Sequence, residues 1–269
     1  MNTHDQHVQG TALITGASAG IGATYADRLA KRGYDLILVA RDQNRLDALA
    51  GRLTNEFGIK IETFKADLLS KSDLARVEQR LREDDHISLL VNNAGISAEG
   101  SLVDGDIDLH ESMIRLNVIA VTRLVGAVSP RFVARGSGTI INICSALALA
   151  PELFNGVYSG TKAFVLNLTQ SLHKELGQKG IQVQAVLPGA VRTEIWGKMG
   201  VDITKLPPGF VMEVDELVDA ALAGLDLGEL VTIPSLPDVA DWETFNTARL
   251  ALVPNLSKDR TAERYKVAV

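Results

Sequence analysis

Short apolar runs alternate along the chain with longer segments in which apolar residues recur every three or four positions. The short runs are typical of buried strands, and the longer segments are typical of amphipathic helices. The expected strands are 11–15, 35–40, 59–67, 87–95, 138–145, 181–189 and 229–234. The expected helices are 21–33, 44–58, 71–84, 107–134 and 157–178. This unbroken alternation predicts an α/β fold in which helices cover both faces of one parallel sheet.

The chain is predicted to form one domain, because no stretch rich in proline, glycine or serine divides the alternation. We expect residues 1–10 to be frayed or disordered and residues 11–269 to form a single doubly wound domain. The least regular part is 193–212, which contains the turn sequence LPPG. Its length favours a substrate lid, and an ordinary surface loop is the alternative. The segment after about 235 could cover the substrate, form an oligomer contact or be plain surface.

Composition narrows the classes of function. The 269 residues are 46% hydrophobic and 22% charged, with a formal net charge of -6, which argues against a general affinity for nucleic acid or anionic membranes. Cys144 is the one cysteine, so an internal disulfide and a cysteine-based metal cluster are excluded. No apolar run approaches the length of a bilayer span, and the first ten residues lack a signal-peptide core. We therefore expect a cytoplasmic protein.

Glycines gather between the first expected strand and the first expected helix, in TGASAGIG (15–22). Glycine lets the backbone turn tightly and approach a pyrophosphate, and the N-terminus of the following helix offers free N–H groups. A plain structural turn is the alternative, since many turns need a positive φ. The position at the first strand–helix junction favours a nucleotide site.

Three features in this order resemble the short-chain dehydrogenase/reductase family: a widely spaced glycine turn, NNAG at 92–95, and the set Ser145, Tyr158 and Lys162. The likeness runs from about residue 11 to 193. It implies a Rossmann-type sheet of about seven strands in the order 3-2-1-4-5-6-7, and a homodimer or homotetramer formed through the helices after strands four and five. The residues that it places at the cofactor are Gly16, Ser18, Ala19, Gly20, Ile21, Gly22, Arg41, Asp67, Leu68, Asn93, Ala94, Gly95, Tyr158, Lys162, Pro188, Gly189, Val191 and Thr193. Asp67 could instead be a helix cap.

The end of the second expected strand bears on the choice of cofactor. A carboxylate there would bind the ribose 2′-OH of NAD and repel the 2′-phosphate of NADP. The strand ends instead in Ala40, which Arg41 and then Asp42 follow. A guanidinium can bind a phosphate through two parallel hydrogen bonds, so Arg41 favours NADP(H) over NAD. The alternative is that Arg41 is a solvated residue, and Ala19 stands where many NADP-binding relatives have a basic residue.

Tyr158 and Lys162 are four residues apart and share one face of the expected helix. A carbonyl that accepts hydride needs a proton on its oxygen, and a free tyrosine, with a pKa of about 10, is a weak acid for this task. We expect the charge of Lys162 to lower the pKa of Tyr158. Ser145, at the carboxyl end of the fifth strand, can hold the substrate oxygen. The resemblance adds Asn117, which would bind a water in a proton relay from Lys162; an ordinary polar helix residue is the alternative.

Other chemistries fit less well. A Ser-His-Asp hydrolase would need a Gly-x-Ser-x-Gly turn, which CSALA (144–148) lacks. The histidines, including His110 and His173 on helices, are interpreted as surface or capping residues, and Cys144 as a core residue. A dehalogenating lyase of the same fold would have arginine in place of Lys162.

The sequence therefore predicts an NADP(H)-dependent carbonyl reductase or alcohol dehydrogenase that uses no metal. A catalytically silent cofactor-sensing or scaffold protein on the same fold is the alternative. Apolar residues near the catalytic set suggest a moderately hydrophobic ketone, aldehyde or secondary alcohol as substrate. The pocket candidates are Leu147, Phe154, Val157, Ile195, Trp196 and Met199. No nucleic acid or membrane partner is expected.

Overall fold

A computed structural model describes residues 9–97, 102–194, 196 and 202–266 of the chain. The chain divides into two compact units, residues 1–234 and residues 235–269. The sequence predicts a single domain for 11–269, whereas the contacts within the chain set 235–269 apart.

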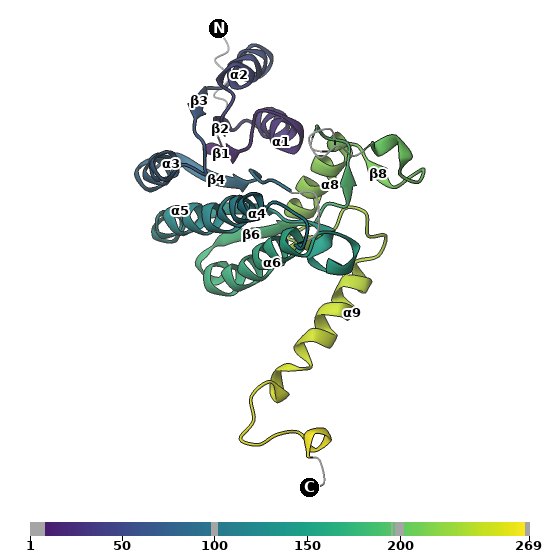
Figure 1. Ribbon diagram of the computed structural model, residues 1–269. Helices are drawn as coiled ribbons and strands as arrows, with labels where there is room; N and C mark the ends of the chain where they lie inside the picture. The colour runs from purple at the N-terminus through teal and green to yellow at the C-terminus, as the bar shows by residue number, and fades with distance from the viewer. Residues whose placement is uncertain (1–8, 98–101, 195, 197–201, 267–269) are drawn as a thin grey trace. The chain divides into compact units, whose positions relative to one another are not determined.

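The first unit is built on a sheet of seven parallel strands (Figure 1). The strands are β1 (Thr11–Thr15), β2 (Asp35–Ala40), β3 (Ile61–Lys65), β4 (Ile87–Asn92), β5 (Gly138–Ile143), β6 (Ile181–Val186) and β9 (Val231–Thr232). Their order is β3-β2-β1-β4-β5-β6-β9, so the predicted strand order is confirmed, with β9 as the seventh strand. The central strands are buried along most of their length, which explains why they read as continuous apolar runs.

Helices cover both faces of this sheet (Figure 1). They are α1 (Gly20–Lys31), α2 (Gln43–Phe57), α3 (Lys71–Glu83), α4 (Ile107–Ile114), α5 (Val121–Arg135), α6 (Gly156–Leu176) and α8 (Val214–Asp226). The described residues of this unit also form 3₁₀ turns in the connections between elements: η2 (Ala146–Ala148), η3 (Pro151–Leu153), η4 (Gly177–Lys179) and η5 (Ile203–Lys205). Side-chain caps fix several boundaries; Asp42, for example, accepts a hydrogen bond from the N–H of Arg45 at the start of α2.

The long helix expected over 107–134 is interrupted. Residues Arg115–Ala120 form a π-helical segment, η1, between α4 and α5. Such segments widen the helix locally and are frequent at functional sites, and Asn117 lies inside this one. By length and composition alone the helical stretch 107–135 could cross a membrane, which the sequence analysis did not expect. Half of its most apolar window is buried inside the protein, and a single helix of this kind is weak evidence for a membrane span.

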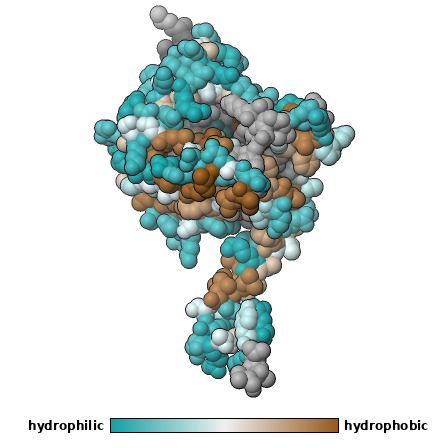
Figure 2. All heavy atoms as spheres, in the orientation of Figure 1, coloured by the Kyte–Doolittle hydropathy of each residue, from teal (hydrophilic) through white to brown (hydrophobic). Residues whose placement is uncertain are grey.

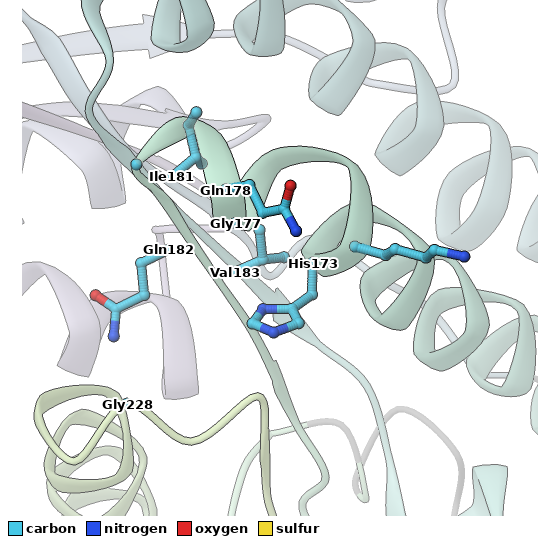
Figure 3. A pocket seen from close by; sticks show the side chains of 9 residues that line it. His173, Gly177, Gln178, Ile181, Gln182, Val183 and Gly228 are labelled. Carbon is cyan, nitrogen blue, oxygen red and sulfur yellow. The ribbon is translucent and has the colours of Figure 1, made fainter. Parts of the chain in front are cut away.

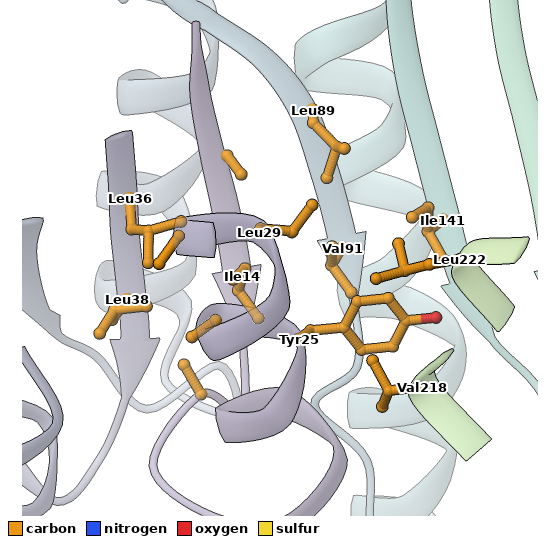
Figure 4. Close-up of a cluster of buried hydrophobic side chains, with 14 of the residues drawn as sticks. Ile14, Tyr25, Leu29, Leu36, Leu38, Leu89, Val91, Ile141, Val218 and Leu222 are labelled. Atoms are coloured by element: carbon orange, nitrogen blue, oxygen red, sulfur yellow. The ribbon is translucent and has the colours of Figure 1, made fainter. Parts of the chain in front are cut away.

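A hydrophobic core holds α1 and α8 on one face of the sheet. Tyr25 of α1 is fully buried, and its ring lies beside Val218 and Leu222 of α8 and beside Val91 and Ile141 of the sheet (Figure 4). Burial raises the pKa of the Tyr25 hydroxyl. This packing fixes α1, and therefore also fixes the glycine turn that connects β1 to α1.

Two short strands, β7 (Ala190–Val191) and β8 (Val211–Met212), pair in parallel and tie together the two ends of the irregular segment. Arg192 Nε also donates to Glu213, at 2.7 Å. The predicted lid, 193–212, is therefore anchored at both ends, and its covering of a substrate stays a prediction.

The second unit contains α9 (Val239–Leu250) and two 3₁₀ turns, η6 (Val253–Asn255) and η7 (Glu263–Tyr265). Asp238 caps α9 by accepting a hydrogen bond from the N–H of Ala240, at 2.9 Å. None of its described residues is buried. The centroids of the Trp242 and Phe245 rings are 5.6 Å apart. The three roles considered for this segment stay open.

Candidate active site

Tyr158 and Lys162 lie at the start of α6. The helix begins there because Asn155 caps it: Oδ1 accepts hydrogen bonds from the N–H groups of Val157, at 2.9 Å, and Tyr158, at 3.1 Å. Tyr158 is therefore in the first turn, and Lys162 is one turn later. The Lys162 Nζ atom is 5.7 Å from the centroid of the Tyr158 ring. The two side chains share one face of the helix, as their spacing predicts.

The ammonium group of Lys162 is bound by the last residue of β5. It is only 7% exposed, and its Nζ donates to the carbonyl oxygen of Ile143, at 3.0 Å. Burial lowers the pKa of Lys162. Cys144 Sγ lies 3.0 Å from the carbonyl oxygen of Lys162 and donates to it, and burial raises the pKa of the Cys144 thiol to about 11. Cys144 is a buried core residue, as predicted, and it lies directly against the catalytic helix.

Ser145 follows β5 and is buried beside Tyr158. Its Oγ accepts a hydrogen bond from the N–H of Leu147, at 3.1 Å, which fixes the 3₁₀ turn η2. The N–H of Ala146 donates to the carbonyl oxygen of Pro188, at 2.8 Å. Ser145 is therefore held close to the segment that begins with Pro188 and Gly189.

The acidity of Tyr158 differs from the prediction. Burial raises its pKa to about 12, while hydrogen bonding with Ser145 lowers the pKa by less. In the protein without bound cofactor, the prediction that Tyr158 is more acidic than usual is therefore wrong. The physical reason is that burial of the Tyr158 hydroxyl itself disfavours the phenolate by more than the hydrogen bond with Ser145 favours it. Tyr158 is consequently protonated at neutral pH and is a proton donor.

Asn117 connects the π-helical segment to Ile96 and to α6 through side-chain hydrogen bonds. Its Nδ2 donates to the carbonyl oxygen of Ile96, at 2.9 Å, and to Thr161 Oγ1, at 3.1 Å. Its Oδ1 accepts from the N–H of Ile96, at 3.0 Å. Thr161 lies between Tyr158 and Lys162 on α6 and donates to the carbonyl oxygen of Tyr158, at 2.7 Å. Asn117 thus connects the π-helical segment to Ile96 and to α6, and its relay role stays a prediction.

The turn after β1 requires its glycines. Gly16 and Gly20 have φ of 66° and 52°, and a Cβ on Gly22 would lie 2.3 Å from the carbonyl oxygen of Gly16. The helix that follows has no side-chain cap at Ala19 and no acidic residue in its first turn. Its N–H groups are therefore suited to an anionic ligand, and the turn fits the pyrophosphate of a dinucleotide.

Thr15 positions the residues of the site, although the sequence did not single it out. Its Oγ1 accepts hydrogen bonds from the N–H groups of Asn93, at 3.0 Å, and Ala94, at 3.1 Å. Asn93 Nδ2 in turn donates to the carbonyl oxygens of Thr15, at 2.9 Å, and Gly16, at 3.1 Å. The side chain of Asn93 therefore holds the glycine turn. The threonine that opens TGASAGIG was the available signal, but its partners are 78 or 79 positions away.

Two glycines show that the cofactor-binding and catalytic residues converge. A Cβ on Gly95 would lie 3.2 Å from Asn117 Oδ1 and 3.6 Å from Lys162 Nζ. A Cβ on Gly20 would lie 3.3 Å from Thr193 Cγ2. Other predicted cofactor residues lie in the glycine turn and in β7. Ser18 and Ile21 are half-buried around the start of α1, and Val191 is buried in β7.

The predicted adenosine residues lie at the ends of β2 and β3. Arg41 follows β2, is exposed, and forms no ion pair with any residue that the structure describes. Asp67 Oδ1 accepts from the N–H of Leu69, at 3.0 Å, and Leu68 is buried. The cap of α3 is Ser70, so the alternative reading of Asp67 as that cap is wrong.

Apolar candidates for the substrate pocket adjoin Tyr158. The Phe154 ring stands at 85° to the Tyr158 ring with centroids 5.8 Å apart. Val157, which precedes Tyr158 in sequence, and Leu147, in the turn η2 that follows Ser145, are both half-buried. Trp196 is half-buried and donates from Nε1 to the carbonyl oxygen of Val191, at 2.6 Å. Ile195 and Met199, the two other candidates, lie outside the described residues.

His110 is not the surface or capping residue that the sequence analysis expects. It is 1% exposed, and neither ring nitrogen has a hydrogen-bond partner in the described part of the chain. The reason is that α4 packs against α6, which turns this side of α4 inward. His173 is exposed, as predicted.

A cavity of about 570 Å³ lies away from this constellation (Figure 3). It is bordered by the end of α6, by η4, by the start of β6 and by Gly228. The amino end of a strand in a parallel sheet lies opposite the edge where Ser145 and Lys162 gather, so this cavity is not the catalytic site. Among the described residues, no group of three or more His, Cys, Asp or Glu side chains could hold a metal ion.

Comparison with known proteins agrees with this geometry. The family model described as short chain dehydrogenase matches residues 10–203. The chain belongs to the short-chain dehydrogenase family. The chain is therefore an oxidoreductase, and the constellation on α6 and after β5 is its candidate active site.

Solved structures of this family resemble the chain over almost its whole length. A short-chain dehydrogenase from Sphingobium yanoikuyae in complex with NADPH is 55% identical, with a TM-score of 0.92 over 95% of this chain and 100% of that one. The bulky-bulky ketone specific alcohol dehydrogenase from Comamonas testosteroni is 49% identical, with a TM-score of 0.89 over 96% of this chain and 99% of that one. The very-long-chain 3-oxoacyl-CoA reductase of Anas platyrhynchos is 37% identical over 188 residues, which are 68% of this chain and 60% of that protein. The chain thus spans about 60% of the length of that reductase.

Proposed function

We propose that this protein is an NADPH-dependent reductase of hydrophobic ketones, in particular of ketones with bulky groups on both sides of the carbonyl. The observation that carries the reaction class is the pairing of Tyr158 with Lys162 next to Ser145 and Gly95. The scaffold alternative has no observation in its favour, because all four predicted catalytic residues are present and Asn117 is hydrogen-bonded to the catalytic helix region.

The cofactor NADPH fits the residues of the groove. The glycine turn and the N-terminus of α1 would hold its pyrophosphate, Arg41 its 2′-phosphate, and Lys162 the ribose next to the nicotinamide. Thr193 lies against Gly20 and would hold the carboxamide. When bound, NADPH supplies the hydride for the carbonyl carbon. The NADPH complex of the Sphingobium relative supports this choice of cofactor.

The protein's own groups supply and stabilise the proton. Ser145 donates a hydrogen bond to the substrate carbonyl oxygen and orients it toward Tyr158. The Tyr158 hydroxyl then gives its proton to that oxygen as negative charge develops there. The resulting phenolate is stabilised by Ser145 and by the ammonium group of Lys162. A raised Tyr158 pKa suits this direction, because the donor is fully protonated at neutral pH.

The preference for bulky ketones follows from apolar surface next to the donor. Phe154 lies edge-on to Tyr158 and is 38% exposed, and Leu153 before it is 77% exposed. Burying such surface against a substrate is favourable, and small ketones would leave it in water. The name of the Comamonas relative points to the same substrate class.

A homodimer or homotetramer in the cytoplasm is part of this proposal. Apolar side chains of α4 and η1, among them Ile107, Ile114 and Ile119, are exposed, and Figure 2 shows hydrophobic side chains gathered over this region. Exposed apolar patches of this kind mark contact surfaces. In such an oligomer, a second copy of the chain would cover the exposed apolar side chains of α4 and η1.

A substrate panel tests the proposal. Loss of NADPH or NADH absorbance would be measured in parallel with a diaryl ketone, an aryl ketone carrying a long alkyl chain, a 3-oxoacyl thioester and acetone. We expect the first two ketones to be reduced with the highest kcat/KM, and with NADPH. Faster reduction of acetone would contradict the substrate class, faster turnover with NADH would contradict the cofactor, and no reduction of any carbonyl would contradict the reaction class. The Tyr158→Phe variant is the control for each substrate.

A further inference from the structure

The second unit, residues 235–269, has no core among its described residues. None of them is buried, and seven large apolar side chains are exposed, among them those of Phe245, Leu252 and Leu256. Their exposed fractions run from 48% for Phe245 to 73% for Leu256. Apolar side chains exposed at such density mark a contact surface.

This unit is too small to be stable by itself. Units of fewer than about 40 residues usually need a disulfide, a metal or an oligomer contact. Residues 235–269 contain neither cysteine nor histidine, so a disulfide and a zinc-type metal site are excluded. Helix α9 has 12 residues, and an isolated helix of that length is marginal in water. Because the contacts within the chain set this unit apart from residues 1–234, the surface that stabilises it belongs to another molecule.

The second unit has a counterpart in a relative of known structure. The Sphingobium enzyme is matched over 95% of this chain and 100% of its own, with a TM-score of 0.92. The unmatched 5% of 269 residues is about 13 residues, whereas the second unit, 235–269, has 35. Most of this unit is therefore present in the solved structure of that relative, although it lacks a core that could hold it in place.

The exposed face of α4 and η1 offers a surface of matching apolar character. Ile107 and Ile114, seven positions apart, lie on the same side of α4 and are 65% and 43% exposed. Ile119 of η1 is 46% exposed. The two apolar surfaces can therefore exclude water from one another, which is the main driving force of association.

The charges of the two surfaces are complementary. Residues 104–114, which include α4, contain four carboxylates and no lysine or arginine. Residues 249–266 of the second unit contain five basic and two acidic residues. Opposite charges around an apolar centre favour this pairing and disfavour the pairing of either surface with itself.

The area of the second unit suffices for a stable contact. Its seven exposed apolar side chains present roughly 700 Å², at about 150–200 Å² for a whole large apolar residue. A standard interface buries about 800 Å² on each partner. Exchange of the unit between two copies doubles the contact and satisfies twofold symmetry.

We propose that the second unit of one copy binds the exposed face of α4 and η1 in a second copy, and that the two copies exchange these units symmetrically. Each copy then covers segment η1, which carries Asn117, in the other. This inference rests on the proposed assembly of copies and is independent of the ketone substrate.

The double variant Leu252→Asp/Leu256→Asp places two charges in the proposed contact. Both side chains are mostly exposed, at 58% and 73%, so the substitutions do not disturb a core. The dissociation constant of the assembly should rise at least 30-fold or so, roughly the loss of one central contact residue. The matched control is Leu227→Asp, at the end of α8. Leu227 is 80% exposed and outside both proposed surfaces, so this variant should assemble like the wild type.

Cross-linking shows which copy each second unit binds. Cys144 is buried and does not compete for a bismaleimide reagent. In the double variant Leu256→Cys/Ile107→Cys, a link between copies gives a product of twice the chain mass of 28.9 kDa, whereas a link within one copy keeps the single mass. We expect the doubled mass. Leu256→Cys/Leu227→Cys is the control and should give no such product.

Static light scattering over a dilution series would measure the assembly of all variants. Unchanged assembly of Leu252→Asp/Leu256→Asp, or equal loss in Leu227→Asp, would overturn the proposed contact. The absence of a Leu256→Cys/Ile107→Cys link between copies would overturn the exchange, and a link within one copy would place the unit on its own chain. A monomeric wild type would refute the assembly itself, while ketone reduction in the substrate panel would still show that the proposed reaction is right.

Discussion

Replacing Asn117 tests whether the π-helical segment holds the active site together. Asn117 is 1% exposed and forms three hydrogen bonds, two with the backbone of Ile96 and one with Thr161. Asn117→Leu keeps a similar volume and removes all three. It leaves the N–H and carbonyl groups of Ile96 unpaired, at roughly 1–3 kcal/mol for each group. Thr161 keeps its bond to the carbonyl oxygen of Tyr158.

Since Ile96 is half-buried and water reaches part of it, we expect the lower half of this range. The free energy of unfolding should fall by about 2–4 kcal/mol. Urea unfolding followed by circular dichroism measures this change. Thr161→Val removes the third bond of Asn117 and also the bond from Thr161 to the carbonyl oxygen of Tyr158, and it should cost about 1–2 kcal/mol.

The double variant then measures the coupling between the two residues. It should be less destabilised than the sum of the single variants by about 1 kcal/mol, because the shared bond can be lost only once. Loss of kcat should accompany the loss of stability, since Ile96 follows Gly95 beside Lys162. An Asn117→Leu protein within about 0.5 kcal/mol of the wild type, the scatter of an ordinary surface substitution, would refute this reasoning.

Three further predictions concern the cofactor and the catalytic pair. Lys162→Met should lower kcat by about 10²- to 10³-fold in steady-state assays, because a charge that stabilises the phenolate is lost, and a wild-type kcat would contradict this. Gly22→Ala should weaken NADPH binding by about 10- to 100-fold in calorimetry, because its Cβ would lie 2.3 Å from the carbonyl oxygen of Gly16; unchanged affinity would show that the turn can move. In the protein without cofactor, burial raises the pKa of Tyr158 to about 12, so Tyr158 should stay protonated from neutral pH through about pH 10. The ultraviolet difference between wild type and Tyr158→Phe should show no phenolate in that window, and its appearance near pH 9 would contradict the burial argument.

The sheet and the order of its strands were predictable because buried parallel strands leave continuous apolar runs, and because the glycine turn marks the first strand–helix junction. The positions of Tyr158 and Lys162 on one helical face followed from their spacing alone. The π-helical segment at Asn117 was not predictable, since a widened turn leaves the apolar periodicity of 107–134 almost unchanged.

Contacts between distant residues account for what the sequence could not show. Thr15 holds Asn93 across 78 positions, and Arg45 meets Glu194 across 149. His110 is buried because another helix covers it, which its own sequence neighbours do not indicate. The pKa of Tyr158 was predicted in the wrong direction because the spacing of Lys162 reveals its proximity but not the burial of the Tyr158 hydroxyl.

The measurement that tests the account most directly is single-turnover reduction of a bulky ketone by the Tyr158→Phe protein preloaded with NADPH. The variant keeps the ring, so NADPH affinity from calorimetry should stay at the wild-type value. The rate of hydride transfer should fall by about 10²- to 10⁴-fold, the contribution of a general acid. Transfer at the wild-type rate from fully bound NADPH would show that another group supplies the proton.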